Sequence, residues 1–128
     1  MVLLDSSVWI AYFNVNDRCH NAAIDILLEL KNHSALSEHA YEEVLNVLRI
    51  KFKNYGCANF VKFLDDHEVE IVMSDEHILS VANSFFFEHK KLSFSDSLIL
   101  ATAILNDLKL VTFDKEMEKV YSKLRVPR

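Results

Sequence analysis

The chain has 128 residues, with 19 Asp plus Glu against 14 Lys plus Arg, a formal net charge of -5, two Cys, one Gly and one Pro. Its length suits one ordinary domain, and its 51% hydrophobic and 26% charged residues are typical of a globular protein with a buried core. Average usage would give roughly nine Gly and six Pro in a chain of this length. The single Gly56 therefore excludes glycine-rich phosphate-binding loops, and the shortage of turn residues disfavours sandwiches and barrels of many short strands.

The cysteines and the apolar segments indicate in which cellular compartment the protein is expected. Cys19 and Cys57 lack the paired spacing of a zinc or redox motif, so two buried free thiols are expected. No segment approaches the ~20 apolar residues of a membrane span. Asp5 interrupts the apolar start of the chain where a signal peptide would continue. We therefore expect a cytoplasmic protein without a membrane partner.

Hydrophobic periodicity predicts strands that alternate with helices along the whole chain. Strands are predicted over residues 1–4, 35–37, 70–74 and 109–113. Helices are predicted over residues 6–13, about 17–31, 38–53, 57–66, 75–89, 95–106 and 115–124. Asn16 or Asp17 is expected to cap the second helix. This alternation favours parallel pairing in an α/β layered fold, and residues 1–128 are expected to form one domain.

Two acidic residues follow predicted strands. Asp5 closes the first strand, and Asp114 follows the fourth. In an open parallel sheet, ligands bind outside the carboxyl ends of the strands where the strand order reverses. A strand-terminal Asp is more often a helix cap than a functional group, so either residue alone indicates little.

Two other acidic residues fall on helix faces that are otherwise apolar. On a helical wheel of the helix after the second strand, Glu43 lies inside a broad apolar arc, whereas Glu42 lies on the face expected to be solvated. Asp96 lies near the middle of the apolar arc of the penultimate helix. A buried carboxylate is normally hydrogen-bonded, paired or metal-bound, because it costs several kcal/mol without a partner. The alternatives are a capping box with Ser93 for Asp96, and a buried polar partner for Glu43.

Four segments of the chain resemble the PIN-domain ribonuclease family, which includes the VapC-type toxins of toxin–antitoxin modules. They are VLLDSSVWIAYF, SEHAYEEVLNVL, LSFSDSLILATAI and KLVTFDKEME. The resemblance spans the whole chain, in the right order and at near-typical spacing. It implies a PIN-like three-layer α/β/α fold with a central parallel sheet of four or five short strands. The family often has a glycine before the final strand, and here Asn106 or Asp107 is expected to make that turn.

The resemblance implies a catalytic metal site, with four acids that are both the catalytic and the metal-ligating residues: Asp5, Glu43, Asp96 and Asp114. Oxygen donors favour Mg²⁺ or Mn²⁺ over zinc. The six His residues show no zinc-binding pattern and are interpreted as surface or satisfied polar groups. The implied reaction is metal-assisted hydrolysis of an RNA phosphodiester. Glu116 and Glu118 are left open as additional ligands.

Polar side chains near these acids are candidates for hydrogen bonds to the carboxylates. Ser6, Ser7 and Thr112 are placed for this role, with ordinary turn or strand positions as the alternative. Asn46, one helical turn beyond Glu43, is a further candidate, with a solvated position as its alternative.

RNA contact needs positive charge around the acidic centre. Arg49, Lys51 and Lys53 cluster at the end of the helix that carries Glu43 and are the candidate RNA-binding residues. A second basic run enriches the C-terminus, at Lys115, Lys119, Lys123, Arg125 and Arg128. Both runs are also compatible with solvated helix faces.

The resemblance also implies protein partners. Family members commonly pair with a second protomer, so a homodimer is expected. Toxin members are inhibited by a small antitoxin whose tail covers the site, which makes a cognate antitoxin the second expected partner. Trp9, Tyr12 and Phe13 are candidates for such contacts or for the core.

Other functions remain open at the level of the sequence. A housekeeping RNA-processing nuclease would use the same chemistry without an antitoxin. A phosphoacceptor receiver domain fits poorly, because two serines follow Asp5 and the third predicted strand ends in Met73, Ser74 and Asp75. A phosphatase of the DxD type would need an acid in place of Ser7. A PIN fold that only binds RNA is disfavoured because all four acids are present.

Overall fold

The computed structural model describes residues 1–125 and arranges four parallel strands in one sheet. They are β1 (Val2–Leu4), β2 (Ser34–Ser37), β3 (Glu70–Val72) and β4 (Lys109–Val111). The strand order is β3-β2-β1-β4. In the centre of the sheet, Leu3 of β1 pairs with Ala35 on one side and with Leu110 on the other.

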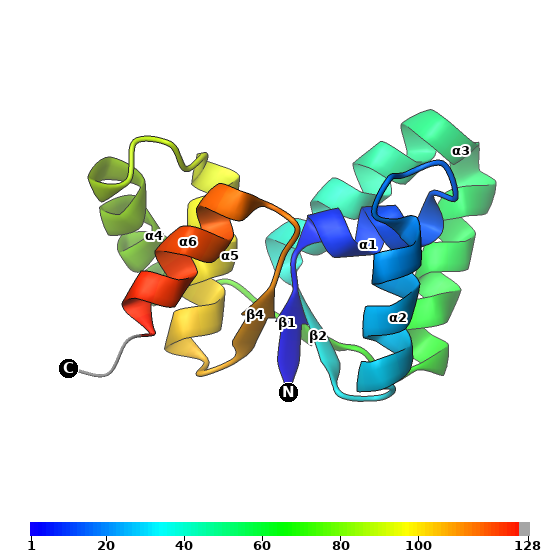
Figure 1. Cartoon of the computed structure of the whole chain (residues 1–128), viewed down its shortest axis with the longest axis horizontal. Coiled ribbons are helices and arrows are strands. Elements are labelled where there is room, and N and C mark those ends of the chain that lie inside the picture. The colour runs from blue at the N-terminus through cyan, green and yellow to red at the C-terminus, as the bar shows by residue number, and fades with distance from the viewer. Residues whose placement is uncertain (126–128) are drawn as a thin grey trace.

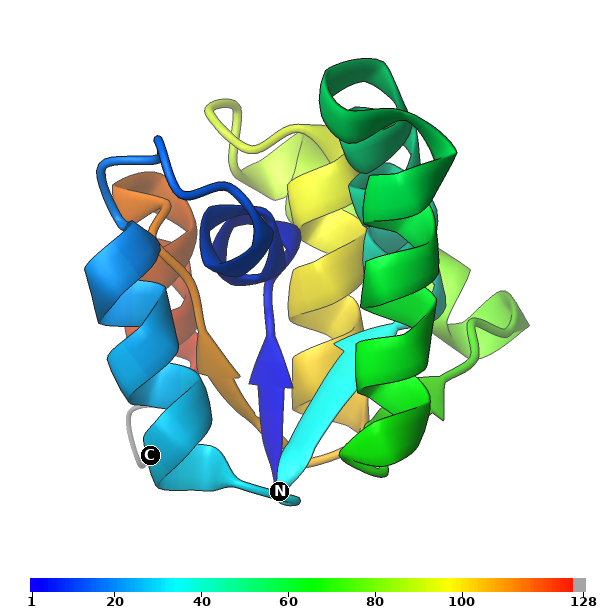
Figure 2. The ribbon, with the colours of Figure 1, turned by 90° about the vertical axis from the view of Figure 1, so that its right-hand side faces the viewer.

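Within the described residues, six helices connect and cover the strands. They are α1 (Ser6–Phe13), α2 (His20–Leu30), α3 (Glu38–Asp66), α4 (Glu76–Glu88), α5 (Phe94–Leu105) and α6 (Lys115–Leu124). Figure 1 shows α1, α2 and α3 on one side of the sheet and the other three helices on the opposite side. In Figure 2, α2 and α3 flank β1 and β2, and α1 lies at the carboxyl end of β1. The predicted α/β fold with three layers is confirmed, and the sheet has four strands.

The strand order creates a reversal next to β1. The chain moves outward from β1 to β2 and β3, and then returns to form β4 on the other side of β1. Because all pairs are parallel, the residues after β1 and β4 meet at the same edge of the sheet. This is the position at which open α/β sheets form a ligand-binding crevice.

The largest side chain of the core lies just beyond β1. Trp9 is fully buried, and its ring lies 6.1 Å from the Phe60 ring and 6.0 Å from the Phe63 ring, centroid to centroid. Its indole N–H donates to the carbonyl of Leu4 at 3.2 Å. An aromatic side chain with its polar atom satisfied in this way stabilises a core. Trp9 is therefore a core residue, and half-buried Tyr12 packs beside it against Phe63.

One predicted helix boundary was wrong. Helix α2 begins at His20, not near residue 17, because the Asp17 carboxylate accepts the backbone N–H of Cys19 at 2.8 Å and holds a turn there. The two helices predicted over residues 38–53 and 57–66 both lie within α3, and the first was correctly predicted to end near Lys53, where α3 has a kink. Lys53 has φ 60° and ψ -160°, so the regular helix is interrupted at that residue.

Other local predictions were confirmed. Asp107 makes the turn before β4 with φ 51°, and Ser93 and Asp96 form a reciprocal capping box at the start of α5. Cys19 and Cys57 are free thiols, although both are half-buried instead of buried. In residues 1–125, the helices are all too short or too polar to cross a membrane.

Candidate active site

Asp5 is a buried carboxylate held by hydroxyl groups at the carboxyl end of β1. Its side chain is only 3% exposed. Oδ2 accepts hydrogen bonds from Ser7 Oγ at 2.7 Å and from Thr112 Oγ1 at 2.8 Å, and Oδ1 accepts a longer one from Ser6 Oγ at 3.4 Å. Donors to the charged form offset the cost of burying it. The three hydroxyls predicted to lie beside a carboxylate thus all bond to Asp5.

The same hydroxyls connect Asp5 to the segment that carries Asp114. Thr112 Oγ1 accepts the backbone N–H of Asp114 at 3.0 Å, and Ser7 Oγ accepts that of Phe113 at 3.1 Å. Oδ1 of Asp114 caps α6 by accepting the N–H groups of its first turn at 2.9 and 3.1 Å. Asp114 is therefore a helix cap, and the hydroxyls of Thr112 and Ser7 connect its segment to Asp5.

Glu43 points inward from α3, as the helical wheel predicts, while Glu42 is exposed. Oε1 of Glu43 is buried and accepts no hydrogen bond from the described residues. Nε2 of His39 lies 3.7 Å from Oε1 of Glu43, beyond hydrogen-bonding distance. Burial raises the pKa of Glu43, and the negative charges of Asp5 and Asp96 add to the rise, whereas His39 and the Ser6 hydroxyl oppose it.

Asp96 serves both as a cap and as part of the acidic cluster. Its backbone N–H donates to Ser93 Oγ at 3.1 Å, and its Oδ2 accepts the N–H of Ser93 at 3.4 Å. Burial raises the pKa of Asp96, with Asp114 and then Asp5 adding to the rise and the bonds with Ser93 opposing it. The capping alternative and the site prediction are therefore compatible.

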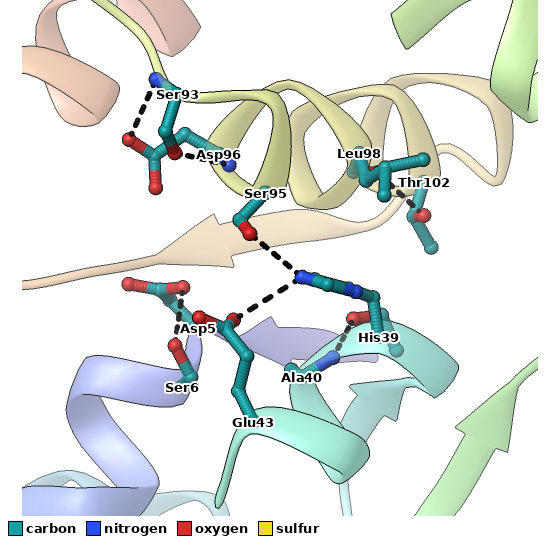
Figure 3. A network of polar contacts seen from close by, with 11 residues as sticks. Asp5, Ser6, His39, Ala40, Glu43, Ser93, Ser95, Asp96, Leu98 and Thr102 are labelled. Atoms are coloured by element: carbon teal, nitrogen blue, oxygen red, sulfur yellow. Dashed lines mark hydrogen bonds and ion pairs between the residues drawn. The ribbon is translucent and has the colours of Figure 1, made fainter.

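The four predicted acids come from four different parts of the chain, and their charges influence one another. The charge of Asp5 adds to the rise in the pKa of both Glu43 and Asp96, and the charge of Asp114 adds to that of Asp96. Figure 3 shows Asp5 and Glu43 facing one another below Asp96. Within residues 1–125, no group of three His, Cys, Asp or Glu side chains has a geometry that could hold a metal ion as it stands. The donor chemistry nevertheless suits a hard divalent cation, since all donors are carboxylate oxygens and Oε1 of Glu43 is buried without a partner.

His39 is the residue at this site that the sequence interpretation missed. It lies one helical turn before Glu43, and its Nε2 is 2.8 Å from Ser95 Oγ at the start of α5 (Figure 3). His39 thus bridges the two helices that carry Glu43 and Asp96. The spacing of four residues between His39 and Glu43 places both on one helix face and was the available indication.

The side chains of the remaining candidates make no hydrogen bond to the four acids among the described residues. Asn46 is exposed on α3, which agrees with the alternative of a solvated position, and it makes no hydrogen bond to the four acids. Arg49, Lys51 and Lys53 are also exposed. Glu116 is half-buried beside two lysines, Glu118 is exposed, and Arg128 lies outside the described residues.

Comparisons with known proteins agree with this fold. VapC20 from Mycobacterium tuberculosis, a Sarcin-Ricin loop cleaving toxin, is 17% identical with a TM-score of 0.84, and the match covers 94% of this chain and 95% of that one. VapBC2 from Rickettsia felis, bound to a DNA fragment from its promoter, is 20% identical with a TM-score of 0.74, covering 93% and 92%. A toxin-antitoxin complex from Klebsiella pneumoniae is 23% identical with a TM-score of 0.71, covering 89% and 87%.

The sequence comparisons decide the family. No curated protein matches the chain significantly. The model of the PIN domain matches residues 2–123, which is nearly the whole chain. The chain therefore belongs to the PIN domain family.

Proposed function

We propose that this protein is a metal-dependent endoribonuclease and the toxin of a type II toxin–antitoxin pair. The observation that carries the proposal is the convergence of four acids at the carboxyl edge of the sheet of a PIN domain. The structurally similar VapC20 is described as a toxin that cleaves the Sarcin-Ricin loop. That description supports RNA as the substrate class for this chain.

In this proposal, Asp5, Glu43, Asp96 and Asp114 hold Mg²⁺ or Mn²⁺. Such an ion supplies Lewis acidity toward the phosphate and neutralises developing charge. Asp5 is fixed by its hydroxyl donors and orients the site. Glu43 and Asp96 would rotate to complete the ligand set, since Oε1 of Glu43 accepts no hydrogen bond and the Asp96 bond is long. Burial is the main cause of their raised pKa values, and the neighbouring carboxylates add a smaller rise that a cation would relieve.

The test of the enzymatic function is RNA cleavage in Mg²⁺ or Mn²⁺ by the wild type and by Asp5→Asn and Asp96→Asn. We expect each variant to lose about 100-fold or more in rate, because each replaces a ligand charge while keeping its shape. Glu42→Gln is the matched control, since Glu42 is the exposed neighbour of Glu43. Metal-dependent cleavage that survives either Asp substitution contradicts the assignment.

The proposed protein partner is a small cognate antitoxin. Its support is that the similar structures include toxin-antitoxin complexes. Induced expression of the chain alone should arrest growth, and Asp5→Asn should relieve the arrest. A housekeeping nuclease would instead be tolerated at the same expression level.

We further propose a homodimer. Its support is the apolar surface of α4, where Phe87 is 78% exposed beside Phe86 and Leu79. Exposed aromatic clusters mark interaction surfaces. Analytical ultracentrifugation should give twice the mass of 14.8 kDa, and Phe87→Ser should shift the equilibrium toward the monomer.

A further inference from the structure

A second polar feature lies between the α4–α5 connection and α6. It is a pocket of about 180 Å³ lined by four lysines. Lys90 and Lys91 belong to the connection, and Lys119 and Lys123 belong to α6. All four residues are exposed. We refer to these four residues and the space between them as the lysine pocket.

The lysine pocket carries an excess of positive charge. Glu116 is the one carboxylate among the described residues that line it, and its Oε1 lies 4.0 Å from Nζ of both Lys91 and Lys119. Ion pairs that are this long and this exposed contribute little to stability. One carboxylate therefore faces four ammonium groups, in a chain whose net charge is -5.

Two features of the lysines in α6 destabilise the helix. Lys115, Lys119 and Lys123 follow one another at a spacing of four residues and share one face. Like charges at this spacing destabilise a helix. Lys115 also stands in the first turn, where the helix dipole disfavours a cation. The dipole favours Lys123 in the last turn, and Lys119 lies 4.0 Å from Glu116, so the helix compensates part of this repulsion. Binding of a polyanion would offset the rest.

The lysine pocket is formed by segments of the chain that also hold two of the four acids. The backbone N–H of Glu116, which lines the pocket, donates to Oδ1 of Asp114 at 2.9 Å. On the opposite wall, Lys91 precedes by two residues the Ser93 cap that bonds to Asp96. Two of the four acids are thus fixed by the segments that also form the lysine pocket.

We propose that the lysine pocket binds the phosphate backbone of the RNA strand beside the cleaved bond. This inference rests on the proposed ribonuclease function and names the surface that holds its substrate. Lysine ammonium groups contact phosphates without reading the bases and attract the strand electrostatically. Such attraction is needed here, because the neighbouring carboxylates repel a polyanion.

The experiment is a binding titration that does not depend on cleavage. A fluorescein-labelled single-stranded RNA of about 15 nucleotides is titrated with the full chain in EDTA, and anisotropy is followed over a range of salt concentrations. The test variant is Lys90→Gln with Lys123→Gln, which leaves both contacts of Glu116 in place. The matched control is Lys31→Gln with Lys62→Gln, which removes the same charge from exposed residues outside the pocket.

We expect the test variant to lose about tenfold in affinity at 0.1 M salt and the slope of log K against log salt to fall by about 1.4, which is two phosphate contacts on a single strand. The control variant should keep the wild-type slope. The melting temperature of the test variant should equal or exceed that of the wild type, because a lysine repulsion on α6 is removed. An unchanged slope in the test variant, or a wild type that does not bind RNA, overturns the proposal.

Other outcomes separate the inference from the proposed function. If the test variant loses RNA affinity while no metal-dependent cleavage is found, the ribonuclease proposal fails and the lysine pocket stands as an RNA site. If cleavage requires the four acids but the test variant keeps the wild-type KM and slope, the lysine pocket alone is contradicted. A poly-glutamate peptide is titrated in the same way. If the test variant binds this peptide more weakly than the wild type does but keeps the wild-type RNA affinity, the lysine pocket is a site for an acidic protein segment, which also overturns the inference.

Discussion

Thr112 and Asp5 lie 107 residues apart in the chain, yet Oγ1 of Thr112 donates a 2.8 Å hydrogen bond to Oδ2 of Asp5 in the buried interior. Thr112 also accepts the backbone N–H of Asp114. A single hydroxyl thus links the ends of β1 and β4 and sets the position of one acid relative to another. Stability and the geometry of the candidate site depend on the same group.

Thr112→Val should destabilise the protein, because it keeps the shape of the side chain while removing a donor to a buried carboxylate. The expected loss is about 1.5–3 kcal/mol in the free energy of unfolding, measured by urea denaturation. The matched control is Thr102→Val, since the buried Thr102 hydroxyl donates to a helical carbonyl of Leu98. That control should change stability by less than about 1 kcal/mol. Equal effects of the two substitutions would show that the bond to Asp5 has no special role.

Stability should depend on pH through Glu43. Its pKa in the folded protein is raised above the ordinary value of 4.5, so the folded state holds this proton more tightly than the unfolded chain does. The contribution is fully present below the unfolded pKa and is lost as the pH rises through the folded pKa. Glu43→Gln should remove this loss and be more stable than the wild type at pH 7 in EDTA.

The measurement for Glu43→Gln is a series of urea titrations from pH 4 to pH 8. The stability difference from the wild type should grow with pH and then level off. Glu42→Gln, at the exposed neighbouring position, should show no such trend. A stability difference for Glu43→Gln that is independent of pH would contradict burial as the cause of the raised pKa.

His39→Ala should raise the pKa of Glu43 further, because the imidazole of His39 opposes the effect of burial. The side-chain carboxyl carbon of Glu43 can be titrated by NMR in both proteins. His67→Ala is a suitable control, since His67 bonds the carbonyl of Phe63 on the exposed end of α3. An unchanged or lower pKa of Glu43 in His39→Ala would show that the 3.7 Å contact carries no charge interaction.

Asp107→Gly should stabilise the turn before β4. Asp107 has φ 51°, a left-handed conformation that costs a non-glycine residue about 1–2 kcal/mol, while the added flexibility of the unfolded chain returns about 0.4–1 kcal/mol. The expected net gain is roughly 0.5 kcal/mol in urea denaturation. Asn106→Gly should instead lose stability, because Asn106 has φ -99° and its amide donates to the carbonyl of Thr102. A loss of stability in Asp107→Gly would contradict the turn.

Much of the fold follows from local patterns in the sequence. An acid or a small polar residue closes or follows β1, β2 and β4, and α6 begins and ends where its pattern predicts. The turn before β4 was predicted at Asn106 or Asp107 because the chain lacks the glycine that related sequences have there, and the structure assigns the left-handed conformation to Asp107. Helix α2 was misplaced because the Asp17 side chain makes a turn that periodicity does not encode.

From the residue pattern alone, a site residue could be predicted only where an acid falls on an otherwise apolar helix face. Glu43 could be found because it interrupts an apolar face, and the structure turns it inward. The four-residue spacing to Glu43 was the one indication for His39, whereas its contact with Ser95 could not be predicted, because Ser95 lies 56 residues away and only the packing of α3 against α5 brings them together. The basic run that contains Lys119 was noted in the sequence, but its position opposite Lys90 could not be predicted, since the two residues come from separate elements.

Calorimetric titration of the purified chain with Mn²⁺ tests whether the four acids form a metal site. We expect saturable binding by the wild type, binding at least about tenfold weaker in Glu43→Gln, and unchanged binding in Glu42→Gln. Absence of binding by the wild type, or equal affinity in Glu43→Gln and the wild type, would contradict a metal site formed by these acids.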